Sequence, residues 1–181
     1  MIDGLMRGPF TQEGVVKAIV VYESHWGNTA SIARAIAAGL GPGAAAVSTR
    51  EASDAVVSGA DLLVAGAPVL GFRLPSDGFL ASLAANPGDG PRPADFTGPS
   101  LRSWLEHLPA GSGRAAAFET RLWWSPGGAT GAITNGLKRA GYRSFDTPHR
   151  FVVRGKYGPL REGELERARQ WGAALAEALG S

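Results

Sequence analysis

The 181-residue chain contains no cysteine. Disulfide bonds, cysteine nucleophiles, zinc sites built on thiolates and cysteine-ligated iron–sulfur clusters are therefore excluded. An excess of one charge is also lacking, because 18 basic residues stand against 16 acidic ones, for a formal net charge of +2. No segment is dense enough in lysine and arginine to indicate nucleic-acid binding. None is apolar over the length of a membrane span.

The composition that is present is typical of one globular domain. Hydrophobic residues make up 44% of the chain and charged residues 19%, which favours a folded protein over a disordered one. The length suits one sizeable core rather than two domains. Residues 1–14 hold several glycines and a proline, so we expect a flexible extension before a domain over 15–181. They lack the pattern of a secretory signal, and we expect a soluble, cytoplasmic protein.

The hydrophobic pattern alternates between strand and helix. Residues 15–22, VVKAIVVY, form a β-branched run typical of a strand buried on both faces of a parallel sheet. Residues 29–40 change to helical spacing. This alternation recurs about five times, which predicts an α/β fold: a doubly wound, five-stranded parallel sheet with helices on both faces. Further strands are expected at 44–48, 61–66, 114–119 and 142–146 continuing at 151–153, and further helices at 51–57, 76–85, 98–108, 129–140 and 161–179.

Ligands of such sheets bind beyond the carboxyl ends of the strands, so the loops after the first, third and fourth strands are the candidate sites. The first loop has the sequence ESHWGNT and leads directly into a helix. Ser24, Asn28 and Thr29 supply short polar side chains, and Gly27 permits a tight turn. Together with the free N–H groups at the helix start, these residues favour an anion. The Walker and Gly-x-Gly-x-x-Gly nucleotide motifs are absent.

The segment YESHWGNT, at residues 22–29, resembles the phosphate-binding loop of flavodoxins and flavodoxin-like reductases. The order of strands and helices over residues 15–180 is also similar to the short-chain flavodoxin layout. The resemblance implies a flavin mononucleotide (FMN) cofactor. Its phosphate would lie on Ser24, Gly27, Asn28 and Thr29.

Two further residues of this loop are candidate cofactor contacts. Trp26 stands where flavodoxins usually carry a hydroxyl residue, and an aromatic there is more like the reductase branch; its backbone N–H remains available. His25 could neutralise the phosphate or donate a proton to reduced flavin, although we expect it to face solvent. An alternative interpretation is that Ser24 and Thr29 only cap the helix and Asn28 only turns the chain.

The second loop, residues 67–75, has the sequence APVLGFRLP. In the resembling family this loop covers one face of the isoalloxazine ring. The threonine and histidine that family members often carry here are absent. Alternatively, Phe72 and Leu74 pack into the domain. The candidate ring contacts from this loop are Pro68, Val69, Leu70, Gly71 and Phe72.

The third loop, residues 119–128, contains two adjacent tryptophans. Because an exposed tryptophan is costly, Trp123 or Trp124 is expected to be buried by a flavin ring or a partner surface. Alternatively, the pair packs against the protein body or a second subunit. Donors in this loop would stabilise the anionic reduced ring at its pyrimidine edge. The candidate donors are Thr120, Arg121, Gly127 and Gly128.

The predicted function is electron transfer between a reductase and an acceptor, either a redox partner protein or a small molecule. Carrier flavodoxins are usually markedly acidic and this chain is not, so a small NAD(P)H-dependent FMN quinone reductase is the first alternative. A flavin-free interaction module with the same fold is the second. The three histidines lack metal-ligand spacing, and no nucleophile elbow is present, so neither a metal site nor a hydrolytic triad is expected.

Overall fold

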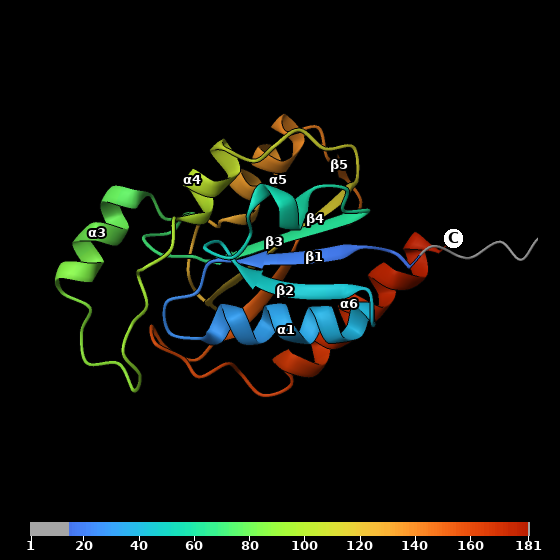
Figure 1. Cartoon of the computed structure of the whole chain (residues 1–181). Coiled ribbons are helices and arrows are strands. Elements are labelled where there is room, and N and C mark those ends of the chain that lie inside the picture. The colour runs from blue at the N-terminus through green and yellow to red at the C-terminus, as the bar shows by residue number, and fades with distance from the viewer. Residues whose placement is uncertain (1–14, 181) are drawn as a thin grey trace, which may run out of the picture.

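The computed structural model describes residues 15–180, so the expected extension over 1–14 lies outside the described residues. A single sheet of parallel strands runs in the order β2-β1-β3-β4-β5, with β6 also paired to β4 (Figure 1). No helix in this part of the chain is long and apolar enough to cross a membrane. The strands are β1 (Ala18–Tyr22), β2 (Ala44–Ser48), β3 (Leu62–Pro68), β4 (Arg114–Leu122), β5 (Arg143–Ser144) and β6 (His149–Val153). The helices are α1 (Asn28–Leu40), α2 (Asp54–Val57), α3 (Asp77–Ala85), α4 (Leu101–Glu106), α5 (Thr130–Arg139) and α6 (Glu164–Leu179).

Two hydrophobic cores, one on each face of the sheet, explain why the strands are apolar throughout. Successive side chains of a strand point to opposite faces, and in β1 Ile19 and Val21 join one core while Val20 joins the other. The first core is covered by α2, α4 and α5, and the second by α1 and α6. Figure 1 places α4 and α5 above the sheet and α1 and α6 below it. The predicted doubly wound fold with helices on both faces is therefore confirmed.

Two separate strands, β5 and β6, occupy the edge of the sheet next to β4, where one strand was expected. β5 pairs with the start of β4, and β6 pairs with residues 118–122 near its end. The break between them contains Pro148, which has no N–H to donate to a ladder. The sheet thus has six strands in five positions, as the divided pattern of residues 142–153 predicts.

Two strands run further than the sequence pattern indicates. β3 and β4 stay in register as far as the pair Pro68 and Thr120, and β6 continues to pair with β4 up to Leu122. Because both neighbours satisfy the backbone of β4, the strand does not end at Glu119 as expected. Pro68, Thr120 and Arg121 therefore lie at strand ends rather than in loops.

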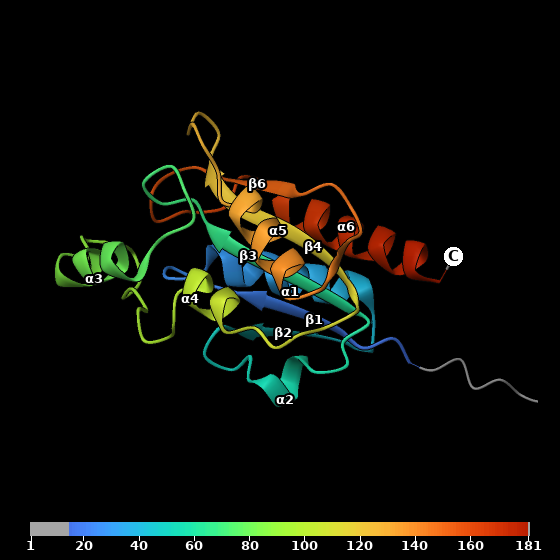
Figure 2. The same cartoon turned by 90° about the horizontal axis from the view of Figure 1, so that it is seen from above.

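Helix α3 stands away from the sheet, beyond the carboxyl ends of the strands (Figures 1 and 2). The helix is capped by Ser76, whose Oγ accepts the N–H of Phe79 at 3.3 Å. Only Leu80 among its residues is buried. The helix and the glycine- and proline-rich segment after it, residues 86–100, therefore cover the edge of the sheet where ligands of this fold class bind.

Candidate functional site

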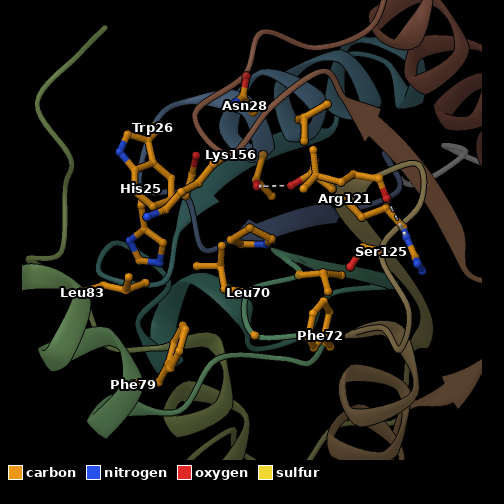
Figure 3. Close-up of a pocket in the computed structure, with 18 of the residues that line it drawn as sticks. His25, Trp26, Asn28, Leu70, Phe72, Phe79, Leu83, Arg121, Ser125 and Lys156 are labelled. Atoms are coloured by element: carbon orange, nitrogen blue, oxygen red, sulfur yellow. Dashed lines mark hydrogen bonds between the residues drawn. The ribbon is translucent and has the colours of Figure 1, made fainter. Parts of the chain in front are cut away.

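The three predicted loops meet around one cavity of about 310 Å³. Figure 3 shows the first loop along one side, with Leu70 and Phe72 facing it, and Arg121 at one end. Gly27 lines a neighbouring cavity instead, and Trp123, Gly127 and Gly128 line neither. The predicted residues that line the first cavity are Ser24, His25, Trp26, Asn28, Thr29, Pro68, Val69, Leu70, Gly71, Phe72, Thr120, Arg121 and Trp124.

The start of α1 offers unpaired donors to this region. Gly27 is the N-cap, with a φ of 90° in the left-handed region that favours glycine, and no side chain caps the helix. The first backbone bond of the helix runs from Ser31 N–H to Gly27 O at 3.0 Å. The N–H groups before Ser31 therefore have no acceptor within the helix. Gly27, having no side chain, leaves them uncovered.

Ser24 carries the most telling polar atom of the first loop. Its Oγ is buried and has no hydrogen-bond partner within the described chain. Most buried polar atoms are satisfied, so an exception needs an explanation. The interpretation of Ser24 and Thr29 as helix caps is wrong, because α1 has no side-chain cap bond.

Asn28 and Thr29 connect the first loop to other parts of the site. The Oγ1 atoms of Thr29 and Thr120 lie 2.8 Å apart, which joins the first loop to the end of β4. Asn28 Nδ2 donates to the backbone oxygen of Tyr157 at 3.1 Å, which joins the loop to the segment after β6. The two side chains thus hold three parts of the chain together around the cavity.

His25 does not face solvent, contrary to expectation. The residue is only 6% exposed, and its ring stacks on Phe96 with centroids 4.6 Å apart. Its Nε2 lies 2.8 Å from Glu23 Oε1, and its Nδ1 lies 2.7 Å from the backbone oxygen of Asp95. A carbonyl and a carboxylate only accept, so both bonds form together when the imidazole carries both protons or Glu23 is protonated. Burial and pairing, which no local sequence pattern reveals, fix this ring in the wall of the site.

Phe72 and Leu74 take opposite places in the second loop. Leu74 is buried, whereas Phe72 is 55% exposed and lines the cavity. The backbone of Phe72 has a φ of 64°, which is rare for a bulky residue and is found mostly where the surrounding structure imposes it. Here the N–H of Gly128 donates to Phe72 O at 3.1 Å, and a Cβ on Gly127 would collide with that oxygen. The two glycines therefore tie the third loop to the second.

The two adjacent tryptophans of the third loop point to different places. Trp124 lines the cavity and is 56% exposed, while Trp123 lies outside the lining and is 75% exposed. Packing of the pair against the protein body is therefore wrong. The geometry leaves Trp124 as the tryptophan able to contact a molecule in the cavity.

Arg121 is held in place by a buried carboxylate. Its NH1 donates to Glu119 Oε1 at 2.9 Å and to Gly127 O at 3.1 Å. Glu119 is fully buried, and its Oε2 accepts the N–H groups of Ala129 at 2.6 Å and Thr130 at 3.0 Å. A carboxylate at the start of α5 is stabilised by these donors. The guanidinium of Arg121 is thus fixed in the cavity wall.

Among the residues that sequence reasoning missed, four come from outside the three predicted loops. Phe79 and Leu83 of α3 and Lys156 after β6 line the first cavity (Figure 3). Arg92, from the segment 86–100, lies over the first loop, with NH1 3.6 Å from where a Cβ on Gly27 would stand. None of them lies in a predicted loop, and only the folded chain brings them there.

Comparisons with known proteins bear on the fold. Neither a scan of protein families nor a search of curated proteins finds a match. Solved structures do match: a flavodoxin from the domain Archaea has 20% identity and a TM-score of 0.63, covering 91% of this chain and 99% of that one.

Two further solved structures agree with that likeness. Flavodoxin 1 from Bacillus cereus has 17% identity and a TM-score of 0.61, covering 89% of this chain and 97% of that one. A short-chain flavodoxin associated with a bacterial microcompartment has 14% identity and a TM-score of 0.62, covering 91% and 99%. The chain therefore has a flavodoxin-like fold, as the resemblance of residues 22–29 predicts.

Proposed function

We propose that this flavodoxin-like chain binds FMN and transfers electrons between a reductase and an acceptor, which is a redox partner protein or a small molecule. The observation that carries the proposal is the buried Oγ of Ser24, which has no partner among residues 15–180, in the loop before the start of α1, which no side chain in that range caps. A phosphate would satisfy that hydroxyl together with the free N–H groups of the helix. The loop lies where β1 meets β3, at the point where the strand order reverses and ligands of such sheets bind.

The rest of the cavity suits a flat, largely apolar ring. Val69, Leu70 and Phe72 supply one wall, and Trp124 adds an aromatic surface. Pockets for organic cofactors are typically lined in this way, with a few fixed polar groups for orientation. Thr120 and Arg121 are such groups, because hydrogen bonds to Thr29 and Glu119 already fix their side chains.

Bound FMN would supply reversible uptake and release of electrons, while the protein sets orientation and electrostatics. Arg121 and Lys156 place positive charge in the cavity wall and would favour the anionic reduced ring. Phe72 and Phe79 would restrict the access of water to it. No side chain of this chain needs to act as a general acid or base.

The first test is the visible absorption spectrum of the full-length protein, as purified and after loading with excess FMN and washing. Two substitutions of one residue provide a matched pair. Asn28→Ala and Asn28→Asp both lose the bond to Tyr157 O, but only aspartate adds a negative charge. Aspartate in the first turn of a helix favours the helix, so the fold should survive in both.

We expect the wild-type protein to retain flavin bands and the Asn28→Ala variant to bind FMN somewhat more weakly. The Asn28→Asp variant should bind roughly tenfold more weakly still, because its carboxylate would repel the phosphate. A wild-type protein that retains no FMN under any loading condition would overturn the cofactor proposal and favour a flavin-free interaction module. Equal affinities of the two variants would show that no anion binds at this loop.

A second candidate, a small FMN-dependent quinone reductase fed by NADH or NADPH, is favoured by the exposed aromatic residues of the cavity. Phe72, Phe79 and Trp124 line it and remain at least partly exposed, which leaves apolar surface for a planar substrate. Steady-state oxidation of NADH or NADPH by the FMN-loaded protein with a quinone separates the two functions. A carrier should give almost no turnover without a separate reductase.

A further inference from the structure

A second cavity, of about 570 Å³, lies on the other side of the phosphate-binding loop proposed above. It shares Ser24, His25 and Trp26 with the first cavity and is also lined by Gly27. Its remaining walls come from the ends of β1 and β2, from α1 and from the segment 86–100. The first loop thus forms a wall of both cavities.

Three arginines from separate parts of the chain line this second cavity, which we term the arginine cavity. Arg34 comes from α1, Arg50 follows β2, and Arg92 belongs to the segment 86–100. Within residues 15–180, none of these guanidinium groups has a carboxylate oxygen within 4 Å. Their one side-chain hydrogen bond in that range joins Arg50 NH1 to Thr97 Oγ1 at 3.3 Å. Since each guanidinium has five donors, most of the donors are available to a ligand.

The carboxylates that line the same cavity are already hydrogen-bonded. Glu51 Oε2 accepts the N–H and the hydroxyl of Ser48, and these bonds, more than the nearby charges of Arg34 and Arg50, lower the pKa of Glu51. Asp95 Oδ1 likewise accepts the hydroxyl and the N–H of Thr97, which, more than the nearby charges of His25 and Arg50, lower the pKa of Asp95.

The third carboxylate, Glu23, accepts the N–H of Leu101 at 2.5 Å and lies against His25. Each of the three negative groups thus has local partners on the protein, whereas the arginine donors are largely unused. The free hydrogen-bonding capacity of the arginine cavity therefore favours an anionic ligand.

We propose that the arginine cavity holds the distal phosphate of a flavin dinucleotide, so that the chain accepts flavin adenine dinucleotide (FAD) as well as FMN. The inference rests on the proposed function, because it needs the flavin phosphate on the first loop. FAD carries an adenosine monophosphate group on that phosphate, and this second phosphate must leave the loop on a side with space and free arginine donors. Gly27 leaves such a side open, and Arg92 stands next to it, with NH1 3.6 Å from where a Cβ on Gly27 would stand.

The test compares FMN and FAD binding to the flavin-free, full-length protein by fluorescence titration. Arg92 is left unchanged, because it lies close enough to the loop to affect both flavins. The double variant Arg34→Ala/Arg50→Ala removes the other two arginines, which line the second cavity but not the first. Arg139→Ala on α5, an exposed arginine outside both flavin-site cavities, is the control for an arginine lost elsewhere.

We expect wild-type protein to bind both flavins, and the double variant to lose roughly tenfold in affinity for FAD while its affinity for FMN stays nearly constant. The Arg139→Ala control should bind both flavins like wild type. Binding of FMN without FAD, or FAD affinity independent of Arg34 and Arg50, would overturn the inference and leave the proposed function standing. Failure to bind either flavin would instead overturn the proposed function itself.

Discussion

The substitution Ser24→Ala should change stability and flavin affinity in opposite directions. The Oγ of Ser24 is buried without a partner, and an unsatisfied buried polar group costs about 1–3 kcal/mol. Removing it should raise the unfolding free energy of the flavin-free protein by about 1 kcal/mol. For a domain of this size that corresponds to roughly 2–4 °C in melting temperature.

The same substitution should weaken FMN binding. A hydrogen bond to a charged group contributes about 1.5–3 kcal/mol, and each 1.4 kcal/mol is about tenfold in affinity. The dissociation constant of the Ser24→Ala variant should therefore rise roughly 10- to 100-fold. Thermal unfolding of the flavin-free protein, followed by circular dichroism, and titration of FMN, followed by fluorescence, measure the two quantities on the same sample.

Ser31→Ala, in the first turn of α1, provides the matched control. The Oγ of Ser31 already donates to Gly27 O at 2.9 Å, so it is not an unsatisfied group waiting for a ligand. FMN affinity should be nearly unchanged in this variant. If Ser24→Ala lowers the melting temperature and leaves FMN affinity unchanged, the hydroxyl is structural and the argument for a phosphate at this loop fails.

Three further predictions concern the core, pH and the tryptophans. Gly66→Ala should lower the unfolding free energy by about 1–3 kcal/mol in urea titrations, because an added Cβ would collide with a ring on β4, whereas Gly78→Ala has open space and should not. Burial lowers the pKa of His149 in the folded protein below its ordinary value of 6.5. The neutral ring therefore stabilises the fold above pH 6.5, and this stability is lost as the pH falls from 6.5 through the lower pKa of the folded state. The variant His149→Phe should therefore lose less stability between neutral and mildly acidic pH, and an equal loss would contradict this. Trp124→Ala should change the fluorescence quenching of FMN on binding while Trp123→Ala should not, because only Trp124 lines the cavity.

The fold was readable from the sequence because its main signals are local. The run at residues 15–22 is apolar on both faces, and β1 contributes to both cores. The convergence of three loops follows from the parallel order of the strands and needs no knowledge of side chains. The predicted ends of strands were less accurate where pairing with a neighbouring strand decides them. Thr120, for example, stays in β4 because it pairs with β6.

The missed parts of the site depend on contacts between distant segments. His25 looks like a loop residue until Phe96, about 70 residues later, covers its ring. Arg92 lies in a segment with no regular structure, so no periodicity predicts that it reaches Gly27. The sequence does not distinguish Trp123 from Trp124, because both are tryptophans in the same loop. The path of the chain after β4 decides that Trp124 faces the cavity.

Two buried glutamates make the same pair of contacts on the two sides of the site, and the sequence alone does not reveal this. Glu23 follows β1 and Glu119 lies in β4, and each contacts the cationic or titratable side chain two residues later, His25 or Arg121. Each also accepts N–H groups at the start of a helix on the same face of the sheet, at Leu101 of α4 and before α5.

In β4, side chains two residues apart point the same way, which places Arg121 beside Glu119. Glu23 and His25 lie in the loop after β1, and the path of that loop brings them together. The carboxylate then binds both the partner and the helix start. Burial makes such bonds costly to break, since one partner would be left unpaired. Two buried carboxyl groups therefore connect the walls of this cavity, in addition to the apolar cores beneath it. Glu23 and Glu119 thus hold His25 and Arg121 in the cavity wall, on opposite sides of the point where the strand order reverses.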